Sequence, residues 1–490
     1  MQLTSLLKAL SAREEIRYKR FGAIAISDIN IDCVTPVSKK CTKGSVFVCI
    51  SGERFDGNDF IDEAYENGTR VFVTEKKTVE LKSGIAIFSN NARKTMAEIA
   101  KILFGLPEKA MLLVGITGTK GKSTVTEIVA GTLRKLGIKT LSVSTYGAEF
   151  DGRLEFGNTT PDSSILYPLM KESYDMGARV AVIEISSQAL KDYRVYGLKF
   201  DMVIFTSFGI DHIGKGEHAT LAEYISAKRS LFTSYGASLA IVNYDDSHSS
   251  FFSFGVGEVI KCGFSRGSDL RISNIREGFF GMSFSLSGIS ESFSVTGTFN
   301  AGTIALAAAA VERISGKSLD EILRIISEIR LPGRFECHSI RSRFAIIDYA
   351  HNEKSLKEMI LAVRALTKRK IITVFGSVGE RSKNRRRELA SVASALSDFS
   401  VITSDNPGYE DPYEIAKEIY SFYPKKESAC IVVDRHEAIL RAFQNSSPGD
   451  VILLLGKGHE EYMTENGERR KFSEREVLLK IKKFGFFGKI

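Results

Sequence analysis

The chain has 490 residues, of which 43% are hydrophobic and 26% are charged, a composition typical of a globular protein with about two to four domains. No apolar run approaches the roughly 18–20 residues of a membrane span, and the first residues become charged too early for a secretory signal, so we expect a cytoplasmic protein without a transmembrane helix. The net charge of +8 is modest and no long basic stripe indicates nucleic-acid binding, while six cysteines without a Cys-x-x-Cys pair are expected to be free thiols.

Residues 1–108 predict a small α/β domain. Short apolar runs occupy residues 22–27, 45–50, 69–74 and 84–88. The segments 55–68 and 91–105 between and after them have the pattern of helices or turns.

Residues 109–330 predict a central domain built on a parallel sheet. Continuous apolar runs without alternation, typical of strands buried on both faces, occupy residues 111–117, 139–145, 178–186, 200–207 and 238–243. Residues 270–297 follow a two-residue period, which predicts a short antiparallel excursion. Two helices are expected over 300–316 and 318–330, the second after a capping box, "SLDE".

Residues 331–490 predict a second doubly wound α/β domain that follows a linker, "LPGRFE" at 331–336. Strand-like runs occupy residues 343–350, 370–376, 399–405, 428–434 and 450–458. Helices are expected between them, for example over 353–368 and 411–423. The sequence therefore indicates an α/β protein of three domains.

The segment from Val114 to Gly137 reads "VGITGTKGKSTVTEIVAGTLRKLG", a strand, a glycine turn and an amphipathic helix. Glycines allow backbone N–H groups to approach phosphate oxygens, and the start of a helix adds partial positive charge. Lys122 can reach the β- and γ-phosphates, and the Ser123 hydroxyl can bind Mg²⁺. Five residues, rather than the usual four, separate Gly115 from Gly121. The segment predicts nucleotide binding, and the alternative is a glycine-rich turn without a ligand.

Polar residues at other strand ends are candidates for the same site. Glu184 and His212 follow strands of the central domain and could bind a phosphate-bound Mg²⁺, although polar residues are common at strand ends. Asp348 and His351 end a strand of the last domain, where a carboxylate can accept hydrogen bonds from ribose. Lys228 lies inside a helical segment, where a lone lysine is normally solvated. The basic stretch 381–390 is read as a solvated helix start or as an anion pocket.

Eight segments occur in the order found in the Mur ligases: "GITGTKGKST", "EISSQALKDYRV", "FGIDHIGKGEHATLAEYISAKRSLF", "LPGRFE", "IIDYAHNEKSL", "VFGSVGERSKNRRREL", "SDNPGYEDP" and "GKGHEEY". The chain resembles most the MurE type, which adds the third amino acid of the peptidoglycan stem to UDP-N-acetylmuramoyl-L-alanyl-D-glutamate. The resemblance implies three domains: a uridine-binding domain at 1–108, a P-loop-type ATPase domain at 109–330 and a Rossmann-like amino-acid-binding domain at 331–490. It implies that ATP phosphorylates the D-glutamyl carboxylate and that an amine then attacks the acyl phosphate.

The resemblance also implies residue roles. Catalysis would depend on Lys122, Glu184, His212 and Lys228. The triphosphate would be held by Gly118, Thr119, Lys120, Gly121, Lys122, Ser123 and Thr124, and the rest of the nucleotide by Asn300, Arg334, Asp348 and His351. Magnesium would be bound by Ser123, Glu184, His212 and Lys228, the last as a carbamate, because a bare ammonium cannot bind a cation. The UDP-linked precursor would contact Ser38, Thr159, Thr160, Ser186, Asp192 and Arg194, with Asp192 standing at a glutamine position of the family. The amino acid would contact Arg386, Asp405, Asn406, Gly408, Gly456 and Glu460.

Gly408 bears on which amino acid is added. Ligases that add meso-diaminopimelate usually have arginine after Asp-Asn-Pro, and this chain has Gly408 there. One charge-assisted hydrogen bond contributes about 1.5–3 kcal/mol, so we expect L-lysine to be preferred over meso-diaminopimelate. The alternatives are a meso-diaminopimelate ligase, a ligase of the folylpolyglutamate synthase kind and, least favoured, a P-loop ATPase without ligase chemistry. We expect a monomer with no nucleic-acid partner.

Overall fold

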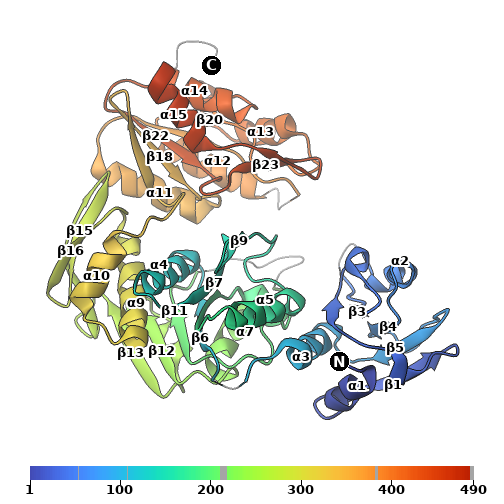
Figure 1. The fold of residues 1–490 in the computed structure, drawn as a ribbon. Coiled ribbons are helices and arrows are strands. Elements are labelled where there is room, and N and C mark those ends of the chain that lie inside the picture. The colour runs from blue at the N-terminus through green and yellow to red at the C-terminus, as the bar shows by residue number, and fades with distance from the viewer. Residues whose placement is uncertain (53–54, 108, 210–217, 381–383, 486–490) are drawn as a thin grey trace. The chain divides into compact units, whose positions relative to one another are not determined.

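The computed structural model of the chain describes residues 1–52, 55–107, 109–209, 218–380 and 384–485 (Figure 1). Two compact units make up the chain. Unit 1 comprises Met1–Ser273, Leu286–Ile289 and Ala301–Ile326, and unit 2 comprises Asn274–Ser285, Ser290–Asn300 and Ser327–Ile490. Among the described residues, no helix combines the length and the apolar character needed to cross a bilayer. All six cysteines have free thiols, as predicted.

The chain begins with a five-stranded sheet in the order β1-β5-β4-β3-β2. The strands β2 to β5 are parallel, and β1 joins the edge antiparallel to β5. The bounds are β1 Arg17–Phe21, β2 Cys33–Thr35, β3 Ser45–Val48, β4 Val71–Thr74 and β5 Gly84–Phe88, with α1 Leu3–Ser11, α2 Ile61–Glu66, α3 Ala92–Phe104 and 3-10 turns at Ile26–Asp28, Ser38–Lys40 and Gly57–Phe60. The predicted mixture of strands and helices is confirmed, except that the apolar run 22–27 ends in a 3-10 turn.

The second sheet has eleven strands in the order β16-β15-β14-β13-β12-β11-β6-β10-β7-β8-β9. Its bounds are β6 Leu112–Thr117, β7 Thr140–Ser144, β8 Gly147–Glu149, β9 Arg153–Leu154, β10 Val180–Glu184, β11 Met202–Phe205, β12 Leu239–Asn243, β13 Glu258–Gly263, β14 Leu270–Gly278, β15 Gly281–Leu286 and β16 Ile289–Phe293. The strand β6 lies between β10 and β11 and is parallel to both, with Val180 opposite Leu112 and Glu184 opposite Ile116. The five continuous apolar runs are therefore neighbouring parallel strands, as predicted.

The helices that accompany this sheet are α4 Lys122–Lys135, α5 Ser163–Asp175, α6 Ser187–Lys191, α7 Leu221–Thr233, α8 Ser249–Ser253, α9 Thr298–Ser315 and α10 Leu319–Ser327. One hydrogen bond of the predicted capping box of α10 is present, in which the Ser318 hydroxyl accepts from the Glu321 amide at 3.3 Å. One buried cluster joins Leu3 of α1 and Met96 of α3 to Leu166 of α5 and Phe252 of α8. The two sheets of unit 1 thus share a continuous hydrophobic core.

Unit 2 contains a six-stranded sheet in the order β17-β18-β22-β19-β20-β21, in which β17 is antiparallel to β18 and the other strands are parallel. The bounds are β17 Glu336–Ile340, β18 Arg343–Asp348, β19 Ile371–Phe375, β20 Phe399–Ile402, β21 Ala429–Ile431 and β22 Val451–Leu455, followed by the antiparallel pair β23 Tyr462–Glu465 and β24 Glu468–Lys471. The helices are α11 Glu353–Leu366, α12 Asn384–Leu396, α13 Pro412–Ser421, α14 Arg435–Gln444 and α15 Glu474–Phe484, with a 3-10 turn at Lys426–Ser428. Separate hydrophobic clusters contain residues of α11, α12 and α13 and residues of α14 and α15, which is the predicted doubly wound arrangement (Figure 1).

The predicted linker, residues 331–336, is only partly a linker. Phe335 is buried and its amide donates to the Asp348 carboxylate at 2.9 Å. The Gly333 carbonyl accepts from the Tyr349 amide at 3.1 Å, and Glu336 begins β17. Residues 333–336 therefore belong to the structure of unit 2. The predicted domain bounds at 108/109 and 330/331 stay predictions.

Candidate active site

The glycine turn predicted to hold phosphate follows β6 and leads into α4. Gly118 and Gly121 have φ angles of +149° and +83°, in the region that favours glycine. A Cβ on Gly118 would lie 2.0 Å from the Thr206 hydroxyl oxygen, and one on Gly121 would lie 2.9 Å from Thr303 Cγ2. A side chain at either position would therefore displace the turn.

The end of β11 holds the turn in place. The Thr119 amide donates to the Ser207 carbonyl at 2.8 Å, and the Thr206 hydroxyl donates to the Lys120 carbonyl at 2.5 Å. Gly121 precedes α4 without a capping side chain. The N–H groups of the first helical turn therefore have no partner in the helix and can bind an anion.

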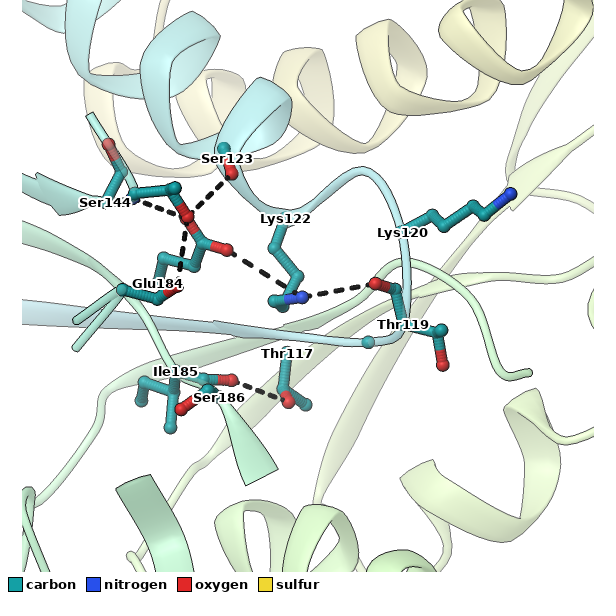
Figure 2. A network of polar contacts seen from close by, with 12 residues as sticks. Thr117, Thr119, Lys120, Lys122, Ser123, Ser144, Glu184, Ile185 and Ser186 are labelled. Carbon is teal, nitrogen blue, oxygen red and sulfur yellow. Dashed lines mark hydrogen bonds and ion pairs between the residues drawn. The ribbon is translucent and has the colours of Figure 1, made fainter. Parts of the chain in front are cut away.

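Lys122 and Glu184 meet beside this turn. The Lys122 ammonium lies 3.7 Å from Glu184 Oε1 and donates to the Thr119 carbonyl at 3.2 Å (Figure 2). Glu184 is the last residue of β10 and is 2% exposed. Its Oε2 accepts from the Thr145 amide at 3.0 Å and from the Thr145 hydroxyl at 3.2 Å, and the Ser123 hydroxyl donates to Thr145 Oγ1 at 3.4 Å. Three predicted residues are thus brought together, and Thr145, which we did not predict, joins them.

Lys228 is buried, so the expectation that a lone helical lysine is solvated is wrong for this residue. Its ammonium donates to the Gly118 carbonyl at 2.7 Å and lies 4.7 Å from the ring centroid of Tyr224. The Tyr224 hydroxyl is 3.0 Å from that of Thr119. The helix α7 therefore contacts the glycine turn through Lys228 and Tyr224. His212, the remaining predicted metal ligand, lies outside the described residues.

Four of the six residues predicted to contact the UDP-linked precursor form a network next to Glu184. The Thr160 hydroxyl donates to the Glu184 carbonyl at 2.8 Å and accepts from the Ser186 amide at 3.2 Å. The Arg194 guanidinium donates to the Thr160 carbonyl at 2.9 Å and to Asp192 Oδ2 at 3.1 Å. Asp192, which stands at a glutamine position of the family, therefore orients Arg194.

Two further precursor residues lie at separate points of unit 1. Thr159 Oγ1 is 3.1 Å from Thr145 Oγ1, which places it in the Glu184 network. The Ser38 hydroxyl donates to Glu63 Oε2 at 2.5 Å, and its carbonyl accepts from the Asn67 side chain at 3.1 Å. Ser38 therefore belongs to the first sheet, and its contacts are made within that domain.

In unit 2, three of the four residues predicted to hold the rest of the nucleotide lie around the end of β18. Asp348 is buried and accepts from the Phe335 and Ala350 amides at 2.9 and 2.8 Å. Burial and the nearby Arg385 cation lower the pKa of His351 to about 4, so its ring is neutral at pH 7. The Arg334 guanidinium lies 5.3 Å from the ring centroid of Tyr349. Asn300, the fourth predicted residue, is buried and donates to the Thr296 carbonyl at 2.7 Å.

The predicted amino-acid pocket is built from loops that follow parallel strands of unit 2. Asn406 Nδ2 donates to Glu460 Oε2 at 2.8 Å. The buried Lys457 ammonium, which we did not predict, donates to Asn406 Oδ1 at 2.9 Å and to Glu460 Oε2 at 2.7 Å. A Cβ on Gly456 would lie 2.3 Å from Asp405 Oδ2, so this position brings the two loops into close contact. The strand ends therefore gather four of the six predicted residues.

Arg386 and Gly408 are the other two residues predicted for the amino-acid pocket. Arg386 is 3% exposed, and its guanidinium donates to Glu410 at 2.6 Å and to Glu418 at 2.5 Å. Gly408 has a φ of +65°, and a Cβ there would lie 3.1 Å from Glu380 Oε2. Arg386 thus fixes the loop between β20 and α13, and position 408 faces an acidic side chain.

The chain matches known proteins along most of its length. Three domain families match in order: "Mur ligase family, catalytic domain" over residues 30–104, "Mur ligase middle domain" over 116–311 and "Mur ligase, glutamate ligase domain" over 333–458. A UDP-N-acetylmuramoyl-L-alanyl-D-glutamate--2,6-diaminopimelate ligase of Aquifex aeolicus is 36% identical over 91% of this chain and 93% of its own length. A solved structure of a ligase with the same name has a TM-score of 0.64 at 22% identity, covering 94% of this chain and 97% of that one. The MurF ligase of Thermotoga maritima, solved in complex with ADP, has a TM-score of 0.60 at 20% identity, covering 94% of this chain and 99% of that one.

Proposed function

The chain belongs to the Mur ligase family, as an ATP-dependent ligase of the MurE type that acts in peptidoglycan precursor synthesis, and we propose that it joins meso-2,6-diaminopimelate to UDP-N-acetylmuramoyl-L-alanyl-D-glutamate. The observation that carries the proposal is the name of the Aquifex aeolicus relative, which aligns with 91% of this chain. The match of residues 30–104 to a Mur ligase domain favours a UDP-linked substrate over the folate substrate of the alternative function, a ligase of the folylpolyglutamate synthase kind.

The preference for L-lysine that we derived from Gly408 is not supported, and the diaminopimelate alternative fits the relatives better. That inference rested on the missing arginine at position 408, although Lys383, Arg385 or Arg387 could supply a cation for the second carboxylate instead. The helix α12 carries three consecutive arginines, Arg385–Arg387, of which Arg387 is exposed. A hydrogen bond to a charged group is worth about 1.5–3 kcal/mol wherever the cation originates, so one missing side chain does not decide specificity.

The glycine turn supports the proposal that Gly118 to Thr124 hold the ATP triphosphate. Side chains are excluded at Gly118 and Gly121, the first N–H groups of α4 lack helical partners, and Lys122 stands beside them. These are the features of a phosphate cradle at a helix start.

Magnesium fits the same place. This ion prefers oxygen ligands and usually combines one or two carboxylates with phosphates and water. The Ser123 hydroxyl and the Glu184 carboxylate both approach Thr145, and in the described ranges no cluster of three His, Cys, Asp or Glu side chains forms a closed metal site. Ser123 and Glu184 would hold the ion, and His212 and a carbamylated Lys228 remain proposed ligands. A bound ion would offset the negative charge of the phosphates and of the acid that they approach.

The side chains present suggest how the reactants are held. Lys122 carries the cation that would contact the phosphates, and Arg194, fixed by Thr160 and Asp192, carries one that would contact the acidic precursor. Asn406 and Glu460 would accept the incoming amino acid. Phosphorylation of the D-glutamyl carboxylate would supply a leaving group, and the amine would displace phosphate to form the amide.

The test is a panel of amino acids with UDP-N-acetylmuramoyl-L-alanyl-D-glutamate and ATP, in which ADP release and product mass are measured. We expect the highest kcat/KM with meso-diaminopimelate and lower values with L-lysine, D-lysine and ornithine. A higher value with L-lysine would refute the proposed amino acid and leave the ligase intact. ATP hydrolysis that ignores the precursor, or ligation of glutamate to tetrahydrofolate, would refute the proposed reaction.

A further inference from the structure

Thr145 follows β7 and occupies a position that no motif indicates. Its hydroxyl oxygen lies 3.4 Å from Ser123 Oγ, 3.1 Å from Thr159 Oγ1 and 3.2 Å from Glu184 Oε2. Its amide also donates to Glu184 Oε2 at 3.0 Å. Thr145 therefore contacts Ser123, which is proposed to lie at the phosphates, Thr159, which is proposed to contact the precursor, and the carboxylate of Glu184.

The valence of a hydroxyl fixes the direction of these hydrogen bonds. A hydroxyl has one proton to donate and two lone pairs, and a carboxylate only accepts. The Thr145 proton is therefore used on Glu184, and its lone pairs accept the protons of Ser123 and Thr159. With its proton turned to Thr145, the Ser123 oxygen keeps its lone pairs for a cation.

Glu184 is constrained in a similar way. Two donors from Thr145 hold its Oε2. Its Oε1 faces the Lys122 ammonium at 3.7 Å (Figure 2). Groups that orient metal ligands in this manner commonly affect metal affinity about 10–100-fold.

We propose that Thr145 is a positioning residue, which orients the Ser123 hydroxyl and the Glu184 carboxylate to receive the divalent cation of the bound nucleotide. The inference rests on the proposed placement of the nucleotide at the glycine turn and does not depend on which amino acid is ligated. Thr145 contacts no reactant in this account and acts through Ser123 and Glu184.

The test compares T145V, which has nearly the same shape but no hydroxyl, with T145S, which keeps the hydroxyl. Binding of a non-hydrolysable ATP analogue is measured by calorimetry with Mg²⁺ and with EDTA, alongside kcat and KM for ATP. We expect T145V to weaken binding roughly tenfold with Mg²⁺ and by less than about twofold with EDTA, and T145S to restore most of the loss. T132V is the matched control, since the Thr132 hydroxyl lies further along α4 and donates only to the Ile128 carbonyl.

Wild-type binding by T145V, an equal loss with Mg²⁺ and with EDTA, or a failure of T145S to recover would each overturn the inference. Melting temperatures of the variants show whether T145V is folded, and T145A replaces it in the comparison if it is not. If the wild-type chain binds the analogue with Mg²⁺ but ligates no amino acid, the proposed function fails while the role of Thr145 is still decided by the binding data.

Discussion

Replacement of Lys457 by methionine tests whether the proposed amino-acid pocket is held together by a buried charge. The Lys457 side chain is 0% exposed, and within the described residues its ammonium and Asn406 are the two side-chain donors to Glu460 Oε2. The same ammonium donates to Asn406 Oδ1, which forces the Asn406 amide to point its Nδ2 at Glu460. Without Lys457, the carboxylate of Glu460 loses its cationic partner and keeps Asn406 as a donor, whose Oδ1 still accepts from the Thr464 amide at 2.9 Å.

The size of the effect follows from the burial of the pair. Removing one partner of a buried ion pair costs about 3–5 kcal/mol. Glu460 retains 13% exposure, so we expect the lower end, about 3 kcal/mol, because water can partly solvate the remaining charge. For a domain of about 150–250 residues each kcal/mol shifts the melting temperature by about 2–4 °C, so K457M should melt roughly 6–12 °C lower.

The assay combines differential scanning calorimetry with steady-state kinetics on K457M, E460Q and the double variant K457M/E460Q. The double variant contains no unpaired charge, so it should regain most of the stability lost in K457M, with a coupling energy of about 1–3 kcal/mol. Its KM for the amino acid should nevertheless stay at least about tenfold above that of the wild type, since Glu460 is missing as a proposed contact. Strictly additive stability losses, or a K457M melting temperature within about 1 °C of the wild type, would refute the reasoning.

Three further outcomes are expected. Burial raises the pKa of Glu336, but hydrogen bonds with His338 and Arg475 lower it overall to about 2. The stability that Glu336 contributes above about pH 4.5 should therefore disappear as the pH falls toward 2, and E336Q should flatten this part of the pH dependence of the melting temperature. His351 has a pKa of about 4 in the folded protein, below its ordinary 6.5, so the free energy of unfolding should decline as the pH falls from about 6.5 to 4. An NMR titration of its ring with a midpoint near 6.5 would contradict this. G121A places a Cβ 2.9 Å from Thr303 at a φ of +83°, which costs about 1–2 kcal/mol of strain. This variant should bind an ATP analogue roughly five- to thirtyfold more weakly in calorimetry. Unchanged affinity would show that the turn adapts.

The parallel strands were predictable because they are buried on both faces. Every residue of β10 and β22 is buried, as is every residue of β6 after Leu112, so a continuous apolar run is a sufficient signal. The strand β24 has the sequence "ERRK" and is exposed throughout. Its conformation depends on pairing with β23, which composition does not report, so sequence reasoning missed it.

The candidate site likewise contains features that the local sequence predicts and features that depend on how distant segments pack. The glycine turn is encoded locally, because the positions that exclude a side chain lie within seven consecutive residues, 118–124. The burial of Lys228 depends on where α7 packs, and the ion pairs of Arg386 reach residues 24 and 32 positions later in the chain. Thr145 has no motif at all, and its role arises from three segments that meet only after folding.

The pairing of β10 with β6, in which Glu184 stands opposite Ile116, has a practical meaning for insertions and deletions. The four residues before Glu184 are all apolar and both faces of the strand are buried, so adding or removing one of them would preserve a hydrophobic strand. Successive side chains point to opposite faces, however, so the carboxylate would be turned away from its partners. A library of single-residue insertions and deletions across residues 180–183 should thus yield abundant but inactive protein. Within this one strand, the apolar residues would determine folding, and the register of Glu184 would determine activity.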